Sequence, residues 1–293
     1  MPTPPLPAPL TLIVATTPIH IPSPANASAG PTTKTVLGIG LNGTLPWPRI
    51  KTDMSFFARV TARPPSATTT TTTTAAAGKA KTNALIMGRK TYDSVPPKLR
   101  PLGKRLNVVV SRDKEGAVAE RVRGELEVKW GREKELAEAK AKAKAEESTA
   151  AGHTTTTAAT TTPAEGRTDA FVSASLEEAL TRLDAAAAEE EGGVGNVFVI
   201  GGAEIYGASL RVGTESGSGV KRKVRLVMTD VEKADGSGFE CDTFFPIDGK
   251  DLAGERWRKV SAEEVTNWVG EEVTGEWIQE GDVRVRMVGY ESV

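Results

Sequence analysis

The stretch Val197–Tyr206, VFVIGGAEIY, combines three features that together decide the fold class. An apolar run comes first, two adjacent glycines follow, and the next residues have the spacing of a helix. The runs NALIMG (83–88) and LNVVVS (106–111) repeat the first feature, since both are nearly continuous in apolar residues. Such runs are typical of strands buried on both faces, as in parallel sheets covered by helices.

The rest of the chain extends this pattern. Short β-branched runs occur at 10–16, 170–173, 223–231 and 282–290, and helical patterns occur at 52–62, 175–191 and 203–210. Strands that alternate with helices predict an α/β fold. In the last run Val283, Val285 and Met287 alternate on one face, which predicts an antiparallel strand near an edge of the sheet.

Composition excludes several classes of protein. The chain of 293 residues has a formal net charge of −1, which argues against nucleic acid or an anionic membrane as a partner. The single cysteine, Cys241, excludes a disulfide framework and a multi-cysteine zinc site, and it fits a reducing compartment. The only histidines, His20 and His153, lie in low-complexity segments, so we expect neither a His-dependent nucleophile nor a metal site.

The amino-terminal segment shows none of the targeting signals that we considered. The apolar run Leu10–Ala15 is too short to span a membrane, and neither the charged front of a signal peptide nor the arginines of a transit peptide accompany it. We interpret it as a buried strand after a proline-rich tail, and we expect no membrane association.

Three segments have low-complexity composition: residues 16–34, 63–81 and 114–167. They are rich in Thr, Ala, Pro and Ser or in Glu, Ala and Lys, and they cannot bury enough apolar surface to offset the entropy of ordering. The Glu/Ala/Lys piece could form a solvated helix. We therefore expect one domain over residues 1–293, decorated by three insertions.

Asp53 is the first candidate for chemistry. Thr52 could cap a helix and place Asp53 in its first turn, on one face with Phe56, Phe57 and Val60. One interpretation is an acid stabilised by the helix dipole with its side chain in water. The other is an acid in an apolar pocket, where desolvation raises its pKa and allows it to donate a proton.

Anion-binding signals follow three strands. Gly88, Arg89, Lys90 and Thr91 follow the first, Ser111 and Arg112 the second, and Gly201 and Gly202 the third. Cations, close backbone approach at glycines and helix N-termini all favour phosphates at the carboxyl ends of strands. Each cation could equally be a plain surface residue, and the same holds for Arg105, which could otherwise clamp a carboxylate.

Together these residues resemble dihydrofolate reductase. The matching pieces are LTLIVAT, GIGLNGTLPWP, DMSFFARVT, LIMGRKTYDSVP, RPLGKRLNVVVSR, VFVIGGAEIY, LVMTDV and CDTFFP, which cover nearly every part of the chain outside the insertions. The resemblance implies a three-layer α/β fold with a central, mostly parallel eight-stranded sheet and an antiparallel C-terminal strand. It also implies NADPH-dependent reduction of dihydrofolate by hydride transfer to C6 and protonation of N5. The long inserts look like those of a fungal or other eukaryotic member.

The resemblance assigns roles to residues of this sequence. Asp53 matches the catalytic carboxylate, Thr229 the threonine that bonds it, and Trp47 the tryptophan that holds a nearby water. Many eukaryotic members carry Glu where this chain has Asp53. The implied substrate contacts are Ile13, Val14, Ala15, Asp53, Met54, Phe57, Val95, Leu102, Arg105, Ile200 and Tyr206. The implied NADPH contacts are Ala15, Ile39, Gly40, Gly43, Thr44, Leu45, Gly88, Arg89, Lys90, Thr91, Ser111, Arg112, Gly201, Gly202, Ala203, Glu204 and Ile205.

Within these contacts, Arg105 would pair with the α-carboxylate of folate. Gly201 and Gly202 match a pair joined by a cis peptide bond, and residues 39–45 match a mobile loop that closes over nicotinamide. We expect inhibition by antifolates such as methotrexate, a cytoplasmic location and a monomer. Three alternatives stay open: a reductase of riboflavin synthesis on the same fold, a non-catalytic NADPH-binding module, and a minor RNA-binding role.

Overall fold

The structure is a computed structural model that describes residues 7–22, 33–63, 81–150, 167–189, 193–212 and 222–293. Part of each predicted insertion, residues 23–32, 64–80 and 151–166, lies outside the described residues. The strands are β1 (Leu10–Pro22), β2 (Thr33–Gly40), β3 (Thr82–Gly88), β4 (Leu106–Val110), β5 (Asp169–Ser173), β6 (Val194–Val199), β7 (Val224–Lys233), β8 (Thr243–Phe244), β9 (Trp257–Val260), β10 (Ile278–Glu280) and β11 (Val283–Ser292). The helices are α1 (Lys51–Ala62), α2 (Arg89–Ser94), α3 (Ala117–Ala150), α4 (Leu176–Ala187), α5 (Ala203–Val212), α6 (Gly249–Leu252) and α7 (Ala262–Val269).

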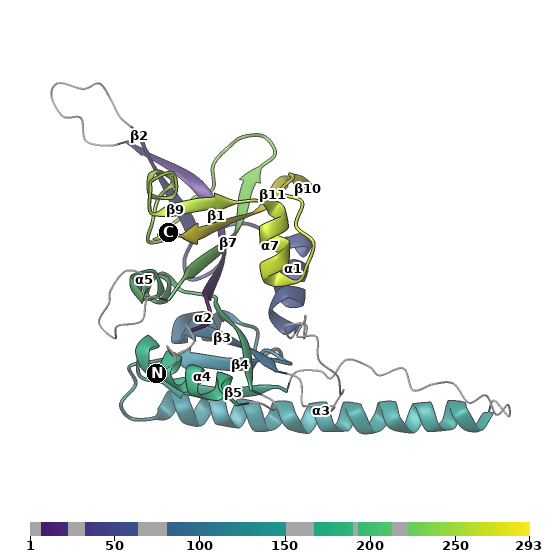
Figure 1. The fold of residues 1–293 in the computed structure, drawn as a ribbon. Coiled ribbons are helices and arrows are strands. Elements are labelled where there is room, and N and C mark those ends of the chain that lie inside the picture. Colours follow the sequence, from purple (N-terminus) through teal and green to yellow (C-terminus); the bar gives the residue numbers. More distant parts are fainter. Residues whose placement is uncertain (1–6, 23–32, 64–80, 151–166, 190–192, 213–221) are drawn as a thin grey trace, which may run out of the picture.

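One sheet organises the molecule (Figure 1). Eight of its strands form a continuous path in the order β10-β11-β7-β1-β6-β3-β4-β5. Every neighbouring pair from β7 to β5 is parallel, whereas β11 runs antiparallel to both β7 and β10. The prediction of a mostly parallel sheet with an antiparallel C-terminal strand is confirmed. Strands β2, β8 and β9 attach beside this path and make the sheet larger than predicted.

Helices cover both faces of the sheet, which gives three layers. Helices α4, α5 and α6 contribute Leu180, Ile205 and Leu252 to the core on one face. Helices α1, α2, α3 and α7 contribute side chains to the core on the other face. Successive residues of β3 alternate between the two cores, which is why its sequence is apolar at nearly every position.

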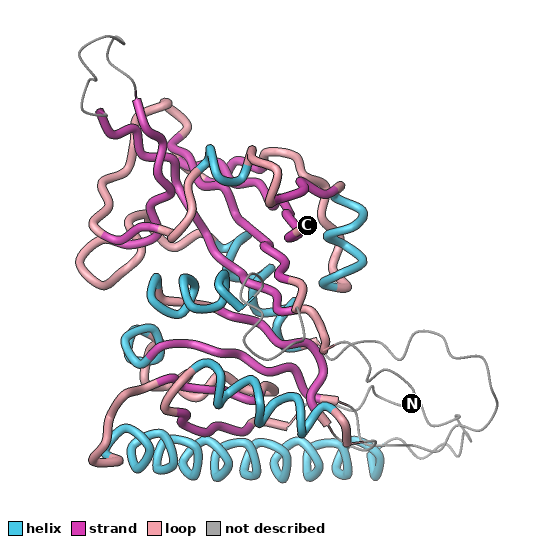
Figure 2. The backbone as a smooth tube through the Cα atoms, turned by 60° about the vertical axis from the view of Figure 1, so that its left-hand side comes forward, coloured by secondary structure: helices cyan, strands magenta, loops and turns pink. Residues whose placement is uncertain are grey.

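Two of the segments that composition predicted to be insertions contain parts of the fold. Strand β1 continues to Pro22 and pairs with β2 from Thr33, so the interpretation of 16–34 as filler is wrong at both its ends. Helix α3 begins at Ala117 and runs along the sheet beneath β5 (Figure 2). The α3 residues Val118, Val122 and Leu126 are buried, although the average composition of the helix is polar. The segment 114–167 is therefore anchored to the core at its start.

Helix α7 was missed in the sequence, although its start carries a clear signal. The Ser261 hydroxyl accepts a hydrogen bond from the Glu264 N–H, and the Glu264 carboxylate accepts one from the Ser261 N–H. This reciprocal capping box is written in the sequence as Ser followed three residues later by Glu. Gly270 ends the helix in the left-handed conformation.

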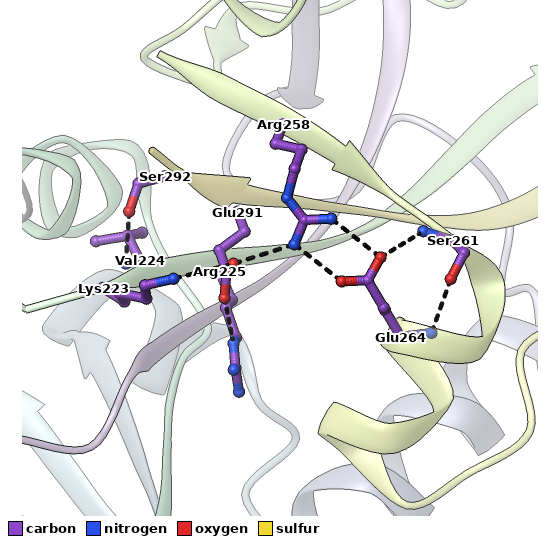
Figure 3. A network of polar contacts seen from close by, with 8 residues as sticks. All are labelled: Lys223, Val224, Arg225, Arg258, Ser261, Glu264, Glu291 and Ser292. Carbon is purple, nitrogen blue, oxygen red and sulfur yellow. Dashed lines mark hydrogen bonds and ion pairs between the residues drawn. The ribbon is translucent and has the colours of Figure 1, made fainter.

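A polar network ties α7 to the ends of β7, β9 and β11 (Figure 3). Buried Glu291 accepts hydrogen bonds from Lys223, Arg225 and Arg258 at 3.3, 3.2 and 3.2 Å. Arg258 also reaches both carboxylate oxygens of Glu264, the α7 capping residue. One carboxylate therefore links three strands that are distant in the sequence.

Among the helices that the structure describes, none has the length and the apolar character needed to cross a lipid bilayer.

Candidate active site

Asp53 lies half-buried in the first turn of α1. Burial raises the pKa of its carboxyl above the usual 3.8, and a hydrogen bond with the Thr229 side chain opposes this shift only in part. Thr229 is buried on β7, directly opposite Ala15 of β1. No cation among the described residues contributes to the shift. The carboxyl can therefore keep a proton to higher pH than an ordinary aspartate, as a general acid requires.

The start of α1 differs from the prediction. The helix begins at Lys51, its N-cap is Ile50, and no side chain of the N-cap residue accepts a hydrogen bond. Thr52 is a helical residue, so its predicted role as the cap is wrong. Glu280 of β10 supplies the missing acceptor from outside the helix, at 2.6 Å from the Lys51 nitrogen and 2.9 Å from the Thr52 nitrogen.

Apolar side chains surround the face of α1 that carries Asp53. Phe56 and Val60 are buried in the core on this side of the sheet, and Phe57, Leu102 and Ile200 pack against that core while partly exposed. A half-exposed apolar wall of this kind fits a flat heterocycle.

Of the three substrate contacts predicted on β1, Ile13 and Val14 lie on opposite faces of the sheet, and Ala15 packs against a third core cluster. Ile13 belongs to the core beneath α1, whereas its neighbour Val14 joins the opposite core. Successive side chains of a strand alternate in direction, so only the backbone of Val14 is available on the Asp53 side. The Ile13 carbonyl accepts a hydrogen bond of 2.6 Å from the buried Tyr206 hydroxyl. Burial and then the charge of Asp53 raise the pKa of Tyr206, so this residue lies within electrostatic reach of the acid.

Arg105 is a buried cation at the opposite end of α1. It is 9% exposed, its Nε donates to the Gly103 carbonyl at 2.8 Å, and its guanidinium donates to the Thr61 hydroxyl at 2.9 Å. Burial alone lowers its pKa to about 10, since no carboxylate contributes. A buried guanidinium without an acidic partner among the described residues is a strong candidate to bind a carboxylate from outside the chain.

The predicted cofactor residues of three strands meet at one end of the sheet. The Gly88 N–H donates to the Gly201 carbonyl at 2.7 Å, and the Gly201–Gly202 peptide is cis, as the resemblance implied. A Cβ atom on Gly88 would lie 3.2 Å from Ile205, and one on Gly202 would lie 3.4 Å from the Thr91 hydroxyl. Glycine at position 88 therefore lets Ile205 of α5 pack close to the end of β3, whereas the contact at Gly202 has an ordinary length. We call the backbone at Gly88, Gly201 and Gly202 the glycine surface.

Charged groups stand around this glycine surface. Arg112 follows β4 and pairs with Glu204 of α5 at 3.0 Å, with both side chains exposed. Arg89 and Lys90 are exposed at the start of α2, which follows β3. Ser111 is buried directly after β4, the strand next to β3 in the sheet. An exposed ion pair is weak in water, so Arg112 can exchange Glu204 for a phosphate at little cost.

The loop expected over the cofactor contains a tight turn. Asn42 and Gly43 have φ values of 51° and 75°, and Leu41 and Thr44 exchange two backbone hydrogen bonds of 2.9 and 3.0 Å. These are the features of an Asn-Gly hairpin turn between short strands. The Asp242 carboxylate accepts a hydrogen bond of 2.7 Å from the Asn42 N–H, so the CDTFFP motif tethers the turn.

Comparisons with known proteins show what this chain is similar to. A family model described as dihydrofolate reductase matches residues 76–154. The dihydrofolate reductase of Gallus gallus is 30% identical over 217 residues, which cover 74% of this chain and 76% of the relative. The chain belongs to the dihydrofolate reductase family. The Candida albicans dihydrofolate reductase is 29% identical over 85% of this chain and 88% of its own length. The solved structure of Schistosoma mansoni dihydrofolate reductase aligns over 98% of this chain and 99% of its own, with 22% identity and a TM-score of 0.49.

The remaining predicted contacts of this dihydrofolate reductase family member differ in how far they are exposed to solvent. Met54 and Leu45 are 40% and 50% exposed, and Val95 is half-buried at the end of α2. Trp47 is buried with Ile50 in a third core cluster, against which Ala15 packs. Ala15 of β1 is paired with Thr229 of β7, so Trp47 lies near the strand that carries the hydroxyl partner of Asp53.

Three contributors to the site were missed in the sequence: Thr61, Glu280 and Asp242. Thr61 holds the Arg105 guanidinium and could have been noticed as a polar residue on the apolar face of α1. Glu280 gave no local signal, because it acts on Lys51, 229 positions away in the sequence. Asp242 lies in the quoted CDTFFP piece, but its contact with Asn42, 200 positions away, could not be seen there.

Proposed function

We propose that this protein reduces 7,8-dihydrofolate to 5,6,7,8-tetrahydrofolate with NADPH, by hydride transfer to C6 and protonation of N5. The observation that carries the proposal is the pair of anchors on α1. Asp53 lies in the first turn, and Thr61 in the last turn holds Arg105. Eight residues of α-helix separate Asp53 from Thr61, a rise of about 12 Å. A substrate with a proton-accepting heterocycle at one end and a carboxylate at the other matches this spacing.

In this proposal different residues bind the two ends of the substrate. Asp53 hydrogen-bonds the pterin ring and supplies a proton, since burial raises the pKa of its carboxyl. Thr229 and the packing of Phe57 and Ile200 hold the ring beside it. Arg105 pairs with the terminal carboxylate, which fixes the register of the ring on Asp53.

The glycine surface fits a dinucleotide phosphate group. The Gly88 N–H donates to the Gly201 carbonyl, and the cis Gly201–Gly202 peptide leads directly into the start of α5, where helical N–H groups favour phosphates. Arg89, Lys90 and Arg112 are exposed cations around it, and Ser111 and Arg112 suit a terminal phosphate, which favours NADPH over NADH. When bound, the cofactor supplies the hydride. Residues 39–45 would exclude water from the reacting atoms by closing over the nicotinamide.

The first experiment is the loss of NADPH absorbance with the purified full chain, with and without dihydrofolate and with methotrexate as the inhibitor control. We expect turnover that requires dihydrofolate and is blocked by methotrexate. Tight NADPH binding without turnover would instead favour a non-catalytic module. Turnover of a pyrimidine intermediate of riboflavin synthesis in place of dihydrofolate would favour the other reductase of this fold.

The wider setting is proposed on the same basis. We propose a single catalytic domain that acts as a monomer in the cytoplasm, where a lone cysteine stays reduced. Its product would feed one-carbon metabolism and the synthesis of thymidylate and purines. Size-exclusion chromatography with light scattering tests the monomer.

A further inference from the structure

Glu280 makes three hydrogen bonds to the start of α1. Its carboxylate oxygens accept from the Lys51 nitrogen at 2.6 Å, the Thr52 nitrogen at 2.9 Å and the Thr52 hydroxyl at 2.7 Å. These bonds lower the pKa of Glu280, so it is charged at neutral pH. The link joins the last strand on this side of the sheet to the helix that carries Asp53.

Little else fixes this end of the helix to β10. A cavity of about 120 Å³ is lined by Thr52, Phe56 and Ile278, so the apolar contact between α1 and β10 is incomplete. Ile50 offers no side-chain acceptor to the first helical N–H groups. Unpaired N–H groups at a helix start attract a nearby carboxylate.

Asp53 is the carboxylate that would otherwise meet this demand. It stands at the third helical position, in the first turn, where the unpaired N–H groups of Lys51 and Thr52 would attract its carboxylate. The groups that face Asp53 from the packed elements are Thr229 of β7 and the Tyr206 hydroxyl of α5, and Lys51 is the cation beside it on α1. Because Glu280 already occupies the first two N–H groups, Asp53 can turn to Thr229.

We infer that Glu280 is a positioning residue for Asp53: it caps α1 from β10 and thereby leaves the catalytic carboxyl to the substrate. The inference rests on the role proposed for Asp53. It predicts that loss of Glu280 lets the helix start attract the Asp53 carboxylate. The charged form of Asp53 is then favoured, its pKa falls, and the supply of protons at neutral pH declines.

The test compares Glu280→Gln with a matched control that contacts the other end of the same helix, Glu271→Gln. Glu271 pairs with Arg59 at 2.6 Å and Arg63 at 3.1 Å at the other end of α1, so the chemical change is the same while the distance from Asp53 is greater. Two readouts are measured: the pH profile of turnover with NADPH and dihydrofolate, and the titration of the Asp53 carboxyl by ¹³C NMR in the substrate-free protein, assigned with Asp53→Asn.

For Glu280→Gln we expect a fall in turnover at neutral pH of about two- to fivefold, the size of a helix-terminus interaction, and a matching shift of both titrations to lower pH. For Glu271→Gln we expect neither titration to move. A Glu280→Gln protein whose two titrations superimpose on those of the parent would overturn the inference.

Two further results separate the possible failures. If the parent does not reduce dihydrofolate, the proposed function fails, while the NMR titration still reports on the Glu280–Asp53 link. If Glu280→Gln does not fold, Glu280→Asp keeps the charge but shortens the side chain that holds the two N–H groups, and it must move the NMR titration in the same direction by a smaller amount. An unmoved titration in that variant would overturn the inference.

Discussion

Two carboxylates of this protein contact β7 and have opposite electrostatics: Asp53 bonds Thr229 in the middle of the strand, and Glu291 pairs with Arg225 at its start. Asp53 has a hydroxyl for a partner, and burial raises its pKa. Burial would also raise the pKa of Glu291, but hydrogen bonds from Arg225, Lys223 and Arg258 outweigh it and lower the pKa (Figure 3). Desolvation thus leaves the pKa of an acid raised where no cation pairs with it, and it is outweighed where cations do. The uncompensated acid can exchange a proton, and the compensated acid holds strands together.

The largest effect is expected from Asp53→Asn, which keeps the shape and removes the proton. We expect turnover of dihydrofolate at neutral pH to fall by about 10²- to 10⁴-fold, the usual contribution of a general acid. The NADPH absorbance assay measures this, with circular dichroism as the check on folding. The exposed-acid control Asp235→Asn should keep the parent rate. Near-full turnover of Asp53→Asn would remove Asp53 from the mechanism.

Arg105→Gln tests the second anchor of the site. The variant loses the charge that would bind the substrate carboxylate, so we expect KM for dihydrofolate to rise roughly 10- to 100-fold. KM for a dihydropterin that lacks the carboxylate-bearing tail should hardly change. An equal loss for both substrates would show that Arg105 supports the fold through Thr61 and does not bind the tail.

Glu291→Gln tests the compensated acid. We expect the free energy of unfolding to fall by about 1–3 kcal/mol, because three donors lose their charged acceptor. Since the folded pKa of Glu291 lies below the usual 4.5, its contribution is complete above that value and is lost as pH falls through the folded pKa. Urea unfolding at pH 7 and below pH 4 should therefore show a difference that shrinks in acid.

A matched control for Glu291 is Glu232→Gln. Glu232 pairs with Arg284, and their side chains are 32% and 46% exposed. An exposed pair contributes about 0–1 kcal/mol, so this variant should unfold close to the parent. Equal losses in the free energy of unfolding would mean that burial does not strengthen the contribution of Glu291 to stability.

The last expected effect, on the stability of the Asp53→Asn protein, has the opposite sign. The folded pKa of Asp53 is raised, so Asp53 supports folding below its unfolded pKa and loses that support as pH rises through the folded pKa. At pH 7 the inactive Asp53→Asn protein should therefore be more stable than the parent, by roughly 0.5–2 kcal/mol. Urea unfolding of both proteins at pH 7 decides this, and a less stable Asn variant would contradict the assigned burial.

Much of the fold could be predicted from local patterns. The two-sided apolar runs at 83–88, 106–111 and 197–202 predicted buried parallel strands, and β3, β4 and β6 lie there. Composition misled at 16–22 and at the start of α3, because a low average of apolar residues hides a few at core spacing, such as Val118, Val122 and Leu126. Helix α7 was missed although its capping box is a local signal.

The sequence by itself determined the residue types of the site: an acid on an apolar helix face, glycines after strands, and an arginine before β4. Only the tertiary structure decided their electrostatic state. The pKa of Asp53 depends on burial against β7, and Arg105 depends on Thr61 of another element. Glu280 reaches the start of α1 across 229 positions of sequence. Charge interactions depend on distance in space and on exclusion of water, and neither is written in the order of residues.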